Sequence, residues 1–168
     1  MKNNNPKKGF TLIELLVVIA IISVLSGVVM QSLSSTRAKS RDAVRLQNIE
    51  SIAKGFQVAT TGANGGQFPS SSGYKCLGVT VSTCWAVGYG FDPTVNSVLS
   101  SGLSGAIPRD PLFTVAQDGG AYVYNSNDSG GAYLFWRMES TSCGRGIGTL
   151  GVPTGSTCKL YLGPPTTP

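Results

Sequence analysis

The chain contains no histidine, and this absence removes the side chain that most often serves as a general base near neutral pH. The Ser-His and Cys-His pairs that activate nucleophiles are therefore excluded. Acids are also scarce, with eight Asp and Glu residues in the whole chain, and they form no paired constellation. No Gly-x-x-x-x-Gly-Lys-Ser/Thr segment occurs, so the chain is not expected to hydrolyse ATP. We therefore expect a protein that is not an enzyme and uses no cofactor.

Zinc binding is disfavoured by the same shortages. Zinc sites in proteins are built mainly from Cys and His, and this chain has neither a His nor a Cys-x-x-Cys pair. We expect no metal.

What the sequence has instead is a long apolar run with a single charge. Residues 10–30 contain one charged side chain, Glu14. A helix of that length spans about 30 Å, the thickness of one hydrocarbon core. A carboxylate within such a helix costs about 2.5–3.5 kcal/mol on insertion scales, so Glu14 is a candidate functional residue. A cleaved secretory signal is the alternative, but its apolar region is usually only about 7–15 residues long.

The charges around this run favour one orientation in a membrane. Lysines precede it, which favours a cytoplasmic N-terminus and an exported remainder. The cations that follow it partly oppose this reading: Arg37, Lys39, Arg41 and Arg45. A long polar domain lies beyond them, and long domains translocate largely regardless of charge. The sequence therefore predicts a single-pass protein of the cytoplasmic membrane.

The start of the run carries a family resemblance. The segment Lys8-Gly9-Phe10-Thr11-Leu12-Ile13-Glu14 resembles the processing motif of type IV pilins and type II secretion pseudopilins. The resemblance implies that a prepilin peptidase cuts between Gly9 and Phe10 and methylates the freed amine of Phe10. The leader, residues 1–9, would then be lost. Removal of its lysines would lower the formal charge from +5 to +2, so the basic pI does not indicate nucleic-acid binding.

The resemblance also gives Glu14 a role. In a bundle of such helices its carboxylate would pair with the Phe10 amine of a neighbouring subunit and set the axial register. A buried charge is tolerated only when it is paired and hydrogen-bonded. The alternative is that Glu14 lies near the membrane interface and extends its carboxylate to water.

The helical pattern continues through residues 31–60 as an amphipathic segment. Apolar residues recur there at helical spacing: Leu46, Ile49, Ile52, Ala53 and Phe56. The charged residues fall largely on other faces, with Asp42–Arg45 and Glu50–Lys54 spaced as ion pairs. We expect the helix to end near residues 56–61, before the turn-forming segment 60–66.

Residues 61–168 read as one small domain rich in Gly, Ser and Thr, with a flexible tail at residues 163–168. Strands are expected at residues 77–82, 121–125, 132–138 and 159–162, with a hairpin loop at residues 125–131. A short helix is expected after its cap Asp92, over residues 93–101. The predicted fold class is α+β, a type IV pilin fold. Its long N-terminal helix, with one apolar and one amphipathic half, packs on a small antiparallel sheet.

The four cysteines are Cys76, Cys84, Cys143 and Cys158. An even number in an exported domain indicates two disulfides, and three connectivities are possible. We favour Cys76–Cys84 with Cys143–Cys158, because both pairs close short loops.

Two further motifs lie in this domain. Residues 106–111 resemble a loop of the major pseudopilin subgroup, where nearby acids bind calcium. This chain departs from that pattern: Leu112-Phe113 replaces Trp-Gly, and Asp118 and Asp128 lack the dense spacing that calcium requires. We therefore expect these aspartates to serve turns. Residues 127–129 form a glycosylation sequon, Asn-Asp-Ser, which is a weak signal.

These observations favour a structural subunit of a type IV pilus, a homo-oligomeric helical filament for adhesion, motility or DNA uptake. The expected partners are the prepilin peptidase, a membrane platform protein and a cytoplasmic assembly ATPase. DNA is a weaker candidate, because no basic–aromatic stripe is evident in the sequence. The subunit would lie in the cytoplasmic membrane before assembly and in an extracellular filament afterwards. The alternative is a type II secretion pseudopilin in a short envelope-spanning piston, and a third reading is an anchored binding module that never polymerises.

Overall fold

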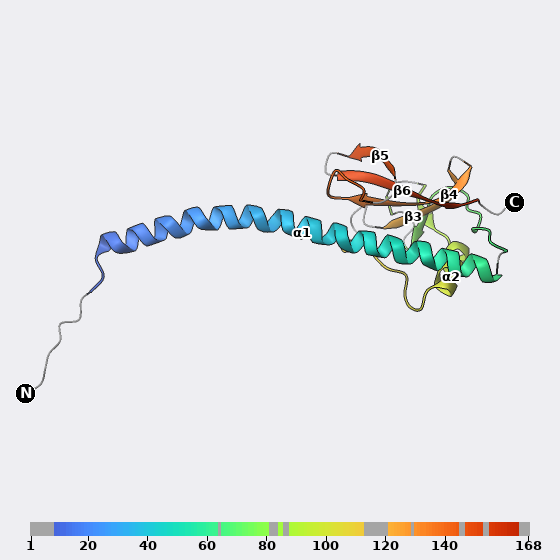
Figure 1. The fold of residues 1–168 in the computed structure, drawn as a ribbon, viewed down its shortest axis with the longest axis horizontal. Helices are drawn as coiled ribbons and strands as arrows, with labels where there is room; N and C mark the ends of the chain where they lie inside the picture. The colour runs from blue at the N-terminus through green and yellow to red at the C-terminus, as the bar shows by residue number, and fades with distance from the viewer. Residues whose placement is uncertain are drawn as a thin grey trace, which may run out of the picture. The chain divides into compact units, whose positions relative to one another are not determined.

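The computed structural model describes residues 9–63, 65–80, 84–85, 88–112, 121–128, 130–144, 147–152 and 155–164. Its elements follow in the order α1–β1–β2–α2–β3–β4–β5–β6. A long N-terminal helix and a mostly antiparallel sheet confirm the predicted α+β fold class (Figure 1). The chain divides into two compact units, Met1–Arg37 and Ala38–Pro168.

Helix α1 (Leu12–Ala63) contributes to both units. Its part in the second unit buries the predicted apolar stripe: Ile49, Ile52 and Phe56 are fully buried, and Ala53 is nearly so. The helix extends to Ala63, beyond the predicted end at residues 56–61. Thr60 and Thr61 support this last turn, because their hydroxyls donate to the carbonyl of Gln57 at 3.1 and 2.9 Å.

The sheet contains six strands within the described residues, in the order β2-β1-β3-β4-β6-β5. The strands are β1 (Lys75–Leu77), β2 (Gly90–Phe91), β3 (Tyr122–Asp128), β4 (Gly131–Met138), β5 (Ile147–Val152) and β6 (Gly155–Gly163). Only the β1–β2 pair is parallel among these strands. The β3–β4 hairpin is tighter than the expected loop, because Asp128 already pairs with Gly131.

Strand β1 lies earlier in the sequence than the strand predicted at residues 77–82. Residues 77–82 were expected to be extended, but β1 ends at Leu77 because Gly78 adopts a φ of 70°, which turns the chain out of the sheet. Residues 81–83 lie outside the described part of the chain. The prediction also missed β2, which has only two residues, and β5, whose glycines weaken the strand pattern.

Helix α2 (Pro93–Gly102) begins as predicted. The Asp92 carboxylate accepts hydrogen bonds from the amides of Thr94 and Val95, and Pro93 occupies the first turn. Its last residue, Gly102, meets Gly55 of α1 so closely that a Cβ at Gly102 would overlap the Gly55 carbonyl oxygen. The two helices can therefore approach only through backbone atoms at this point.

The close contact between Gly102 and Gly55 predicts that a methyl group added at Gly102 lowers stability. Gly102→Ala should lower the free energy of unfolding by about 1–3 kcal/mol, because the helices must separate to admit the Cβ. Gly105→Ala is the matched control, since a Cβ there meets no atom within 4 Å. Urea unfolding followed by tryptophan fluorescence gives both values. Equal stability of the two variants would contradict the proposed packing.

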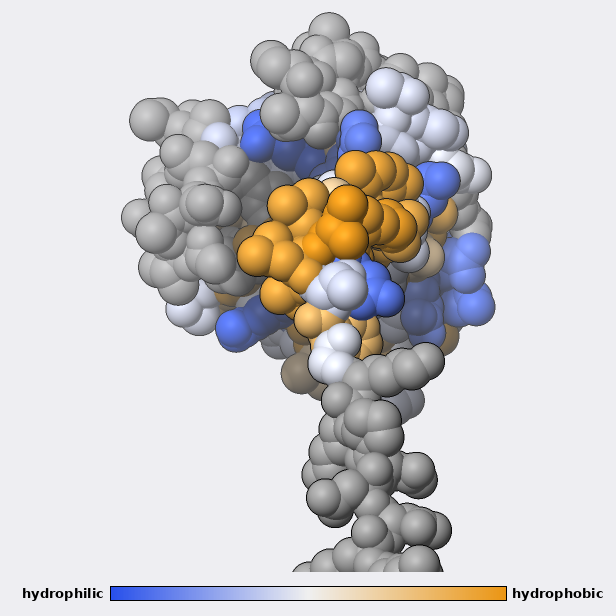
Figure 2. All heavy atoms as spheres, turned by 90° about the vertical axis from the view of Figure 1, so that its left-hand side faces the viewer, coloured by the Kyte–Doolittle hydropathy of each residue, from blue (hydrophilic) through white to orange (hydrophobic). Residues whose placement is uncertain are grey.

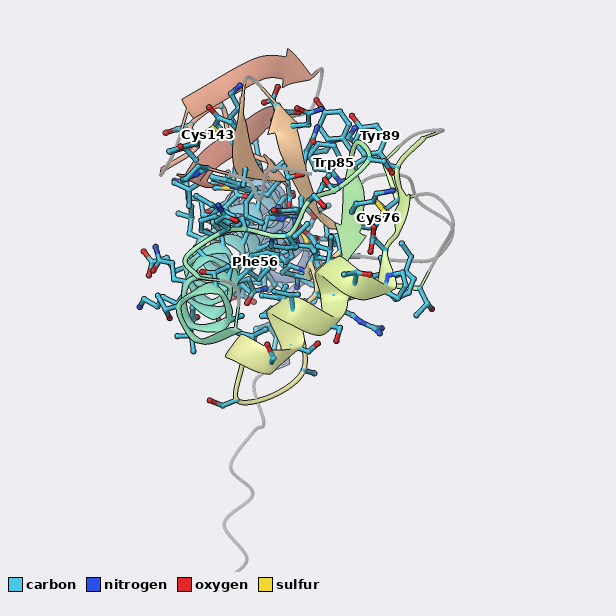
Figure 3. The ribbon with its side chains drawn as sticks, turned by 90° about the vertical axis from the view of Figure 1, so that its right-hand side faces the viewer. Phe56, Cys76, Trp85, Tyr89 and Cys143 are labelled. Carbon is cyan, nitrogen blue, oxygen red and sulfur yellow. A yellow bond between two sulfur atoms is a disulfide. The ribbon has the colours of Figure 1, made fainter. Side chains whose placement is uncertain are left out.

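Two apolar clusters lie on opposite faces of the sheet. The inner cluster joins α1 and α2 to the sheet through Phe56, Leu99, Leu134 and Trp136, and Phe56 stacks on Tyr124 at 4.9 Å between ring centroids. The outer cluster contains Cys76, Cys84, Trp85, Val123 and Phe135. Figure 3 shows Phe56 beside the helices and Trp85 and Tyr89 away from them.

Both predicted disulfides are present. Cys76 pairs with Cys84, and Cys143 pairs with Cys158 across a sequence separation of 15 residues. The first closes the loop between β1 and β2, and the second joins the β4–β5 connection to β6. By the chain-entropy model, a loop of about 15 residues gains about 3 kcal/mol from such a bond.

Candidate functional site

The start of α1 is a capping box formed by Thr11 and Glu14. The Thr11 amide and hydroxyl both donate to the Glu14 carboxylate at 2.8 Å, and the Glu14 amide donates to the Thr11 hydroxyl at 3.3 Å. This reciprocal pattern satisfies amides that have no partner at a helix N-terminus. In the single chain the carboxylate is therefore already hydrogen-bonded. The spacing Thr-x-x-Glu is a recognised sequence signal for this motif, so the cap could have been predicted from the sequence.

Gly9 and Phe10 lie just before this cap, outside the helix. Both are exposed, and the Phe10 side chain retains 88% of its accessible surface. No atom lies within 4 Å of the position that a Cβ of Gly9 would take. The peptide bond between them is therefore sterically open. Residues 1–8 lie outside the described part of the chain.

The first part of α1 exposes nearly all of its apolar side chains. Large hydrophobic residues from Phe10 to Met30 retain 47–88% of their accessible surface. Figure 2 faces the N-terminal end of the helix and shows hydrophobic side chains, in orange, gathered around it. Within the described residues, α1 is the one helix that is long and apolar enough to cross a membrane. So much exposed apolar surface needs a hydrophobic environment, either lipid or other helices.

A second polar constellation surrounds Arg45 on the later part of α1. Its guanidinium binds the Asp110 carboxylate in a bidentate manner at 2.7 and 3.1 Å. It also donates to Asp42 and to Glu139, each at 2.8 Å. Arg45, Asp42 and Asp110 are at most 7% exposed. A buried guanidinium thus holds together α1, the loop after α2 and the end of β4.

Neighbouring groups complete this network. Arg41 donates to both oxygens of Glu139 at 2.6 and 2.7 Å. The Asp42 carboxylate accepts the amides of Glu139 and Ser140 at 3.0 and 2.9 Å. The hydrogen bonds from Arg41, reinforced by Arg45, lower the pKa of Glu139. Burial alone would raise the pKa of Asp42, but its hydrogen bonds from those amides and from Arg45 outweigh burial and lower it.

The network corrects part of the sequence analysis. The predicted Asp42–Arg45 pair exists, but these residues face the interior rather than an outer face of the helix. Asp110 and Glu139 were not identified as their partners. The Asp110 carboxylate accepts the Leu112 amide at 2.8 Å and also neutralises Arg45. Nothing in the local sequence around either acid indicates a partner 65 or 94 residues away.

The remaining motifs are only partly described. Asp128 forms an ion pair with Lys159 at 3.1 Å. Asp118, the other acid of the calcium comparison, lies outside the described residues, as does Ser129 of the sequon. Among the described residues, no group of three or more potential ligands is placed to hold a metal ion.

Residues 4–30 match the family model for the prokaryotic N-terminal methylation motif, the signal of type IV pilins and pseudopilins. The match covers the open peptide bond, the capping box and the apolar part of α1. No solved structure matches the chain.

Proposed function

We propose, from the methylation motif at residues 4–30, that the chain is a structural subunit of a type IV pilus. The observation that carries the proposal is Glu14, which lies within that motif and is the one charge in the exposed apolar segment of residues 10–30. A membrane anchor alone needs neither this carboxylate nor a glycine before Phe10. A subunit whose helices bundle in a filament core needs both.

Processing is the first step of this proposal. The prepilin peptidase cuts between Gly9 and Phe10 and methylates the Phe10 amine. Gly9 presents no side chain that would crowd the scissile carbonyl, and the bond lies outside the helix. The cut removes residues 1–9 as a leader. Residues 10–30 then form the transmembrane and filament-core segment, residues 31–60 the amphipathic segment, and residues 61–168 the globular domain.

Glu14 has two successive partners in this scheme. In the membrane the carboxylate is satisfied within its own chain by Thr11. In the filament it pairs with the Phe10 amine of a neighbouring subunit, which compensates for its burial between helices. The subunit leaves the membrane with the help of a platform protein and an assembly ATPase and becomes part of an extracellular fibre for adhesion, motility or DNA uptake.

A type II secretion pseudopilin is the second candidate. It is favoured by the segment 106–111, which resembles a loop of the major pseudopilins. In this chain, however, Asp110 of that segment binds Arg45, so its carboxylate is already neutralised by a cation. The two disulfides favour a subunit displayed outside the cell.

Electron microscopy of sheared cell-surface material, with mass spectrometry of the purified fibre, tests the proposal. We expect thin fibres built from a chain that begins at N-methylated Phe10. A processed chain that remains in the membrane fraction without fibres would favour the pseudopilin. A chain that still begins at Met1 would overturn both candidates.

A further inference from the structure

The outer face of the sheet carries a continuous series of aromatic rings, which we call the outer ladder: Tyr161, Tyr133, Phe135, Tyr74, Tyr89 and Trp85. Phe135 and Trp85 are buried, so the accessible rings are those of the four tyrosines. Successive ring centroids lie 5.2, 6.3, 5.3, 4.6 and 6.0 Å apart. Its rings come from β4, β6 and the segments that flank β1 and β2. The sequence analysis found no such basic–aromatic stripe, because these residues are spread over nearly 90 positions of the chain.

Cations border the ladder. The Lys159 ammonium lies 4.8 Å from the Tyr133 ring centroid, and the Arg137 guanidinium lies 4.7 Å from that of Trp85. Lys159 is also paired with Asp128 at 3.1 Å. Its charge is therefore largely balanced within the protein. This pairing weakens the attraction of the Lys159 end of the ladder for a polyanion, whose binding depends on unneutralised Lys and Arg.

The four tyrosines of the ladder keep part of their surface exposed. Tyr161 is 55% exposed, and Tyr74, Tyr89 and Tyr133 are partly exposed. Within the part of the chain that the structure describes, none of these four hydroxyls has a hydrogen-bonding partner. The buried tyrosines differ, since Tyr122 and Tyr124 are bonded to Asn48 and to the Pro69 carbonyl.

Gly131 leaves the space that the Tyr161 ring, the most exposed ring of the ladder, occupies. A Cβ at Gly131 would overlap the edge of the Tyr161 ring and would approach the Tyr133 ring within 3.3 Å. The missing side chain therefore lets Tyr161 lie against the sheet backbone while the rest of the ring remains exposed. A rigid, exposed ring binds with little loss of conformational entropy.

We propose that the outer ladder binds a neutral oligosaccharide. The C–H faces of a pyranose carry partial positive charge and pack on aromatic faces, which carry partial negative charge. Sugar hydroxyls both donate and accept, which matches tyrosine hydroxyls that have no partner among the described residues. The pairing of Lys159 with Asp128, close to Tyr133, favours a neutral chain over a nucleic acid at this end of the ladder. This inference does not depend on filament assembly, because it concerns the second compact unit alone.

The test is ligand-observed NMR of the purified mature chain in a detergent without a sugar headgroup. The probes are the neutral sugars maltohexaose, chitohexaose and laminarihexaose. A single-stranded oligothymidylate is tested separately as the anionic alternative ligand. We expect at least one hexasaccharide to bind. Tyr161→Ala should weaken that binding by about tenfold, the loss expected when a stacking ring is removed.

Two variants serve as controls. Phe91→Ala removes an exposed aromatic residue outside the ladder and should leave binding unchanged. Tyr161→Phe keeps the ring and should retain most of the affinity. The proposal is overturned if no hexasaccharide binds at millimolar concentration, if Phe91→Ala and Tyr161→Ala behave alike, or if only oligothymidylate binds.

Discussion

Cells that carry Glu14→Ala should produce almost no fibres, although the leader is still removed. The carboxylate lies in an otherwise apolar helix, and in the proposed filament its partner is the Phe10 amine of another subunit. Without it, each incoming amine would be buried unpaired, at a cost of several kcal/mol per subunit. Such a cost, repeated at every step of polymerisation, should reduce the yield of sheared fibres to background. Quantitative immunoblots of the sheared fraction, with mass spectrometry of the membrane fraction, measure both effects.

The capping box requires controls, because Glu14→Ala also removes a helix cap. Glu14→Gln keeps an oxygen that can accept the Thr11 hydrogen bonds but removes the charge. Thr11→Ala removes most of the cap but keeps the charge, and a lost cap costs only about 1 kcal/mol. If charge pairing drives assembly, Glu14→Gln should lose fibres and Thr11→Ala should keep them. The opposite pattern would show that helix initiation, not pairing, is the role of Glu14.

Arg45→Met should lower the free energy of unfolding of the globular unit by about 3–5 kcal/mol, the cost of breaking a buried ion pair from one side. The variant keeps an unbranched apolar side chain but leaves Asp42 and Asp110, both nearly fully buried, without their cation. Urea unfolding with intact disulfides, followed by the fluorescence of Trp85 and Trp136, measures the loss. Lys39→Met, an exposed cation on the same helix, should change stability by less than about 0.5 kcal/mol.

Two further measurements identify electrostatics as the cause. Adding Asp42→Asn and Asp110→Asn to Arg45→Met should recover part of the loss, since no buried carboxylate then remains unpaired. The difference between wild type and Arg45→Met should also shrink in acid. The folded-state pKa values of Asp42 and Glu139 are lowered, so their contribution is present above their ordinary pKa and lost as the pH falls through the folded value. A difference that is constant from neutral pH to pH values below those pKa values would indicate a packing effect instead.

The features that could be predicted from the sequence are those with local signals. The apolar stripe of α1, the Asp92-Pro93 start of α2 and the hairpin strands each depend on residues a few positions apart. The disulfide pairing followed from loop length. The capping box was equally local and could have been found from Thr11 and Glu14 together.

The features that were missed depend on contacts between distant segments. Arg45 meets Asp110 and Glu139 only after the loop following α2 and the end of β4 have both packed against α1. The outer ladder likewise forms only when β4 and β6 pair, which places Tyr133 opposite Tyr161. The predicted strand at residues 77–82 was wrong for residues 78–80, because the β-favourable sequence continues past Gly78 but the backbone leaves the sheet there.

The position of β6 has a consequence for the order of events during synthesis. This strand is the last that the structure describes, yet it lies between β4 and β5 and pairs with both. In a growing polypeptide, β4 can pair with β3, but its other edge has no partner until residues 155–163 have emerged from the ribosome. Cys143 likewise cannot form its disulfide until Cys158 has been synthesised. Oxidation of this pair therefore indicates that β6 has joined the sheet. A premature stop codon before β6 would leave α1 folded but would expose the unpaired edge of β4, and such an edge is prone to aggregation.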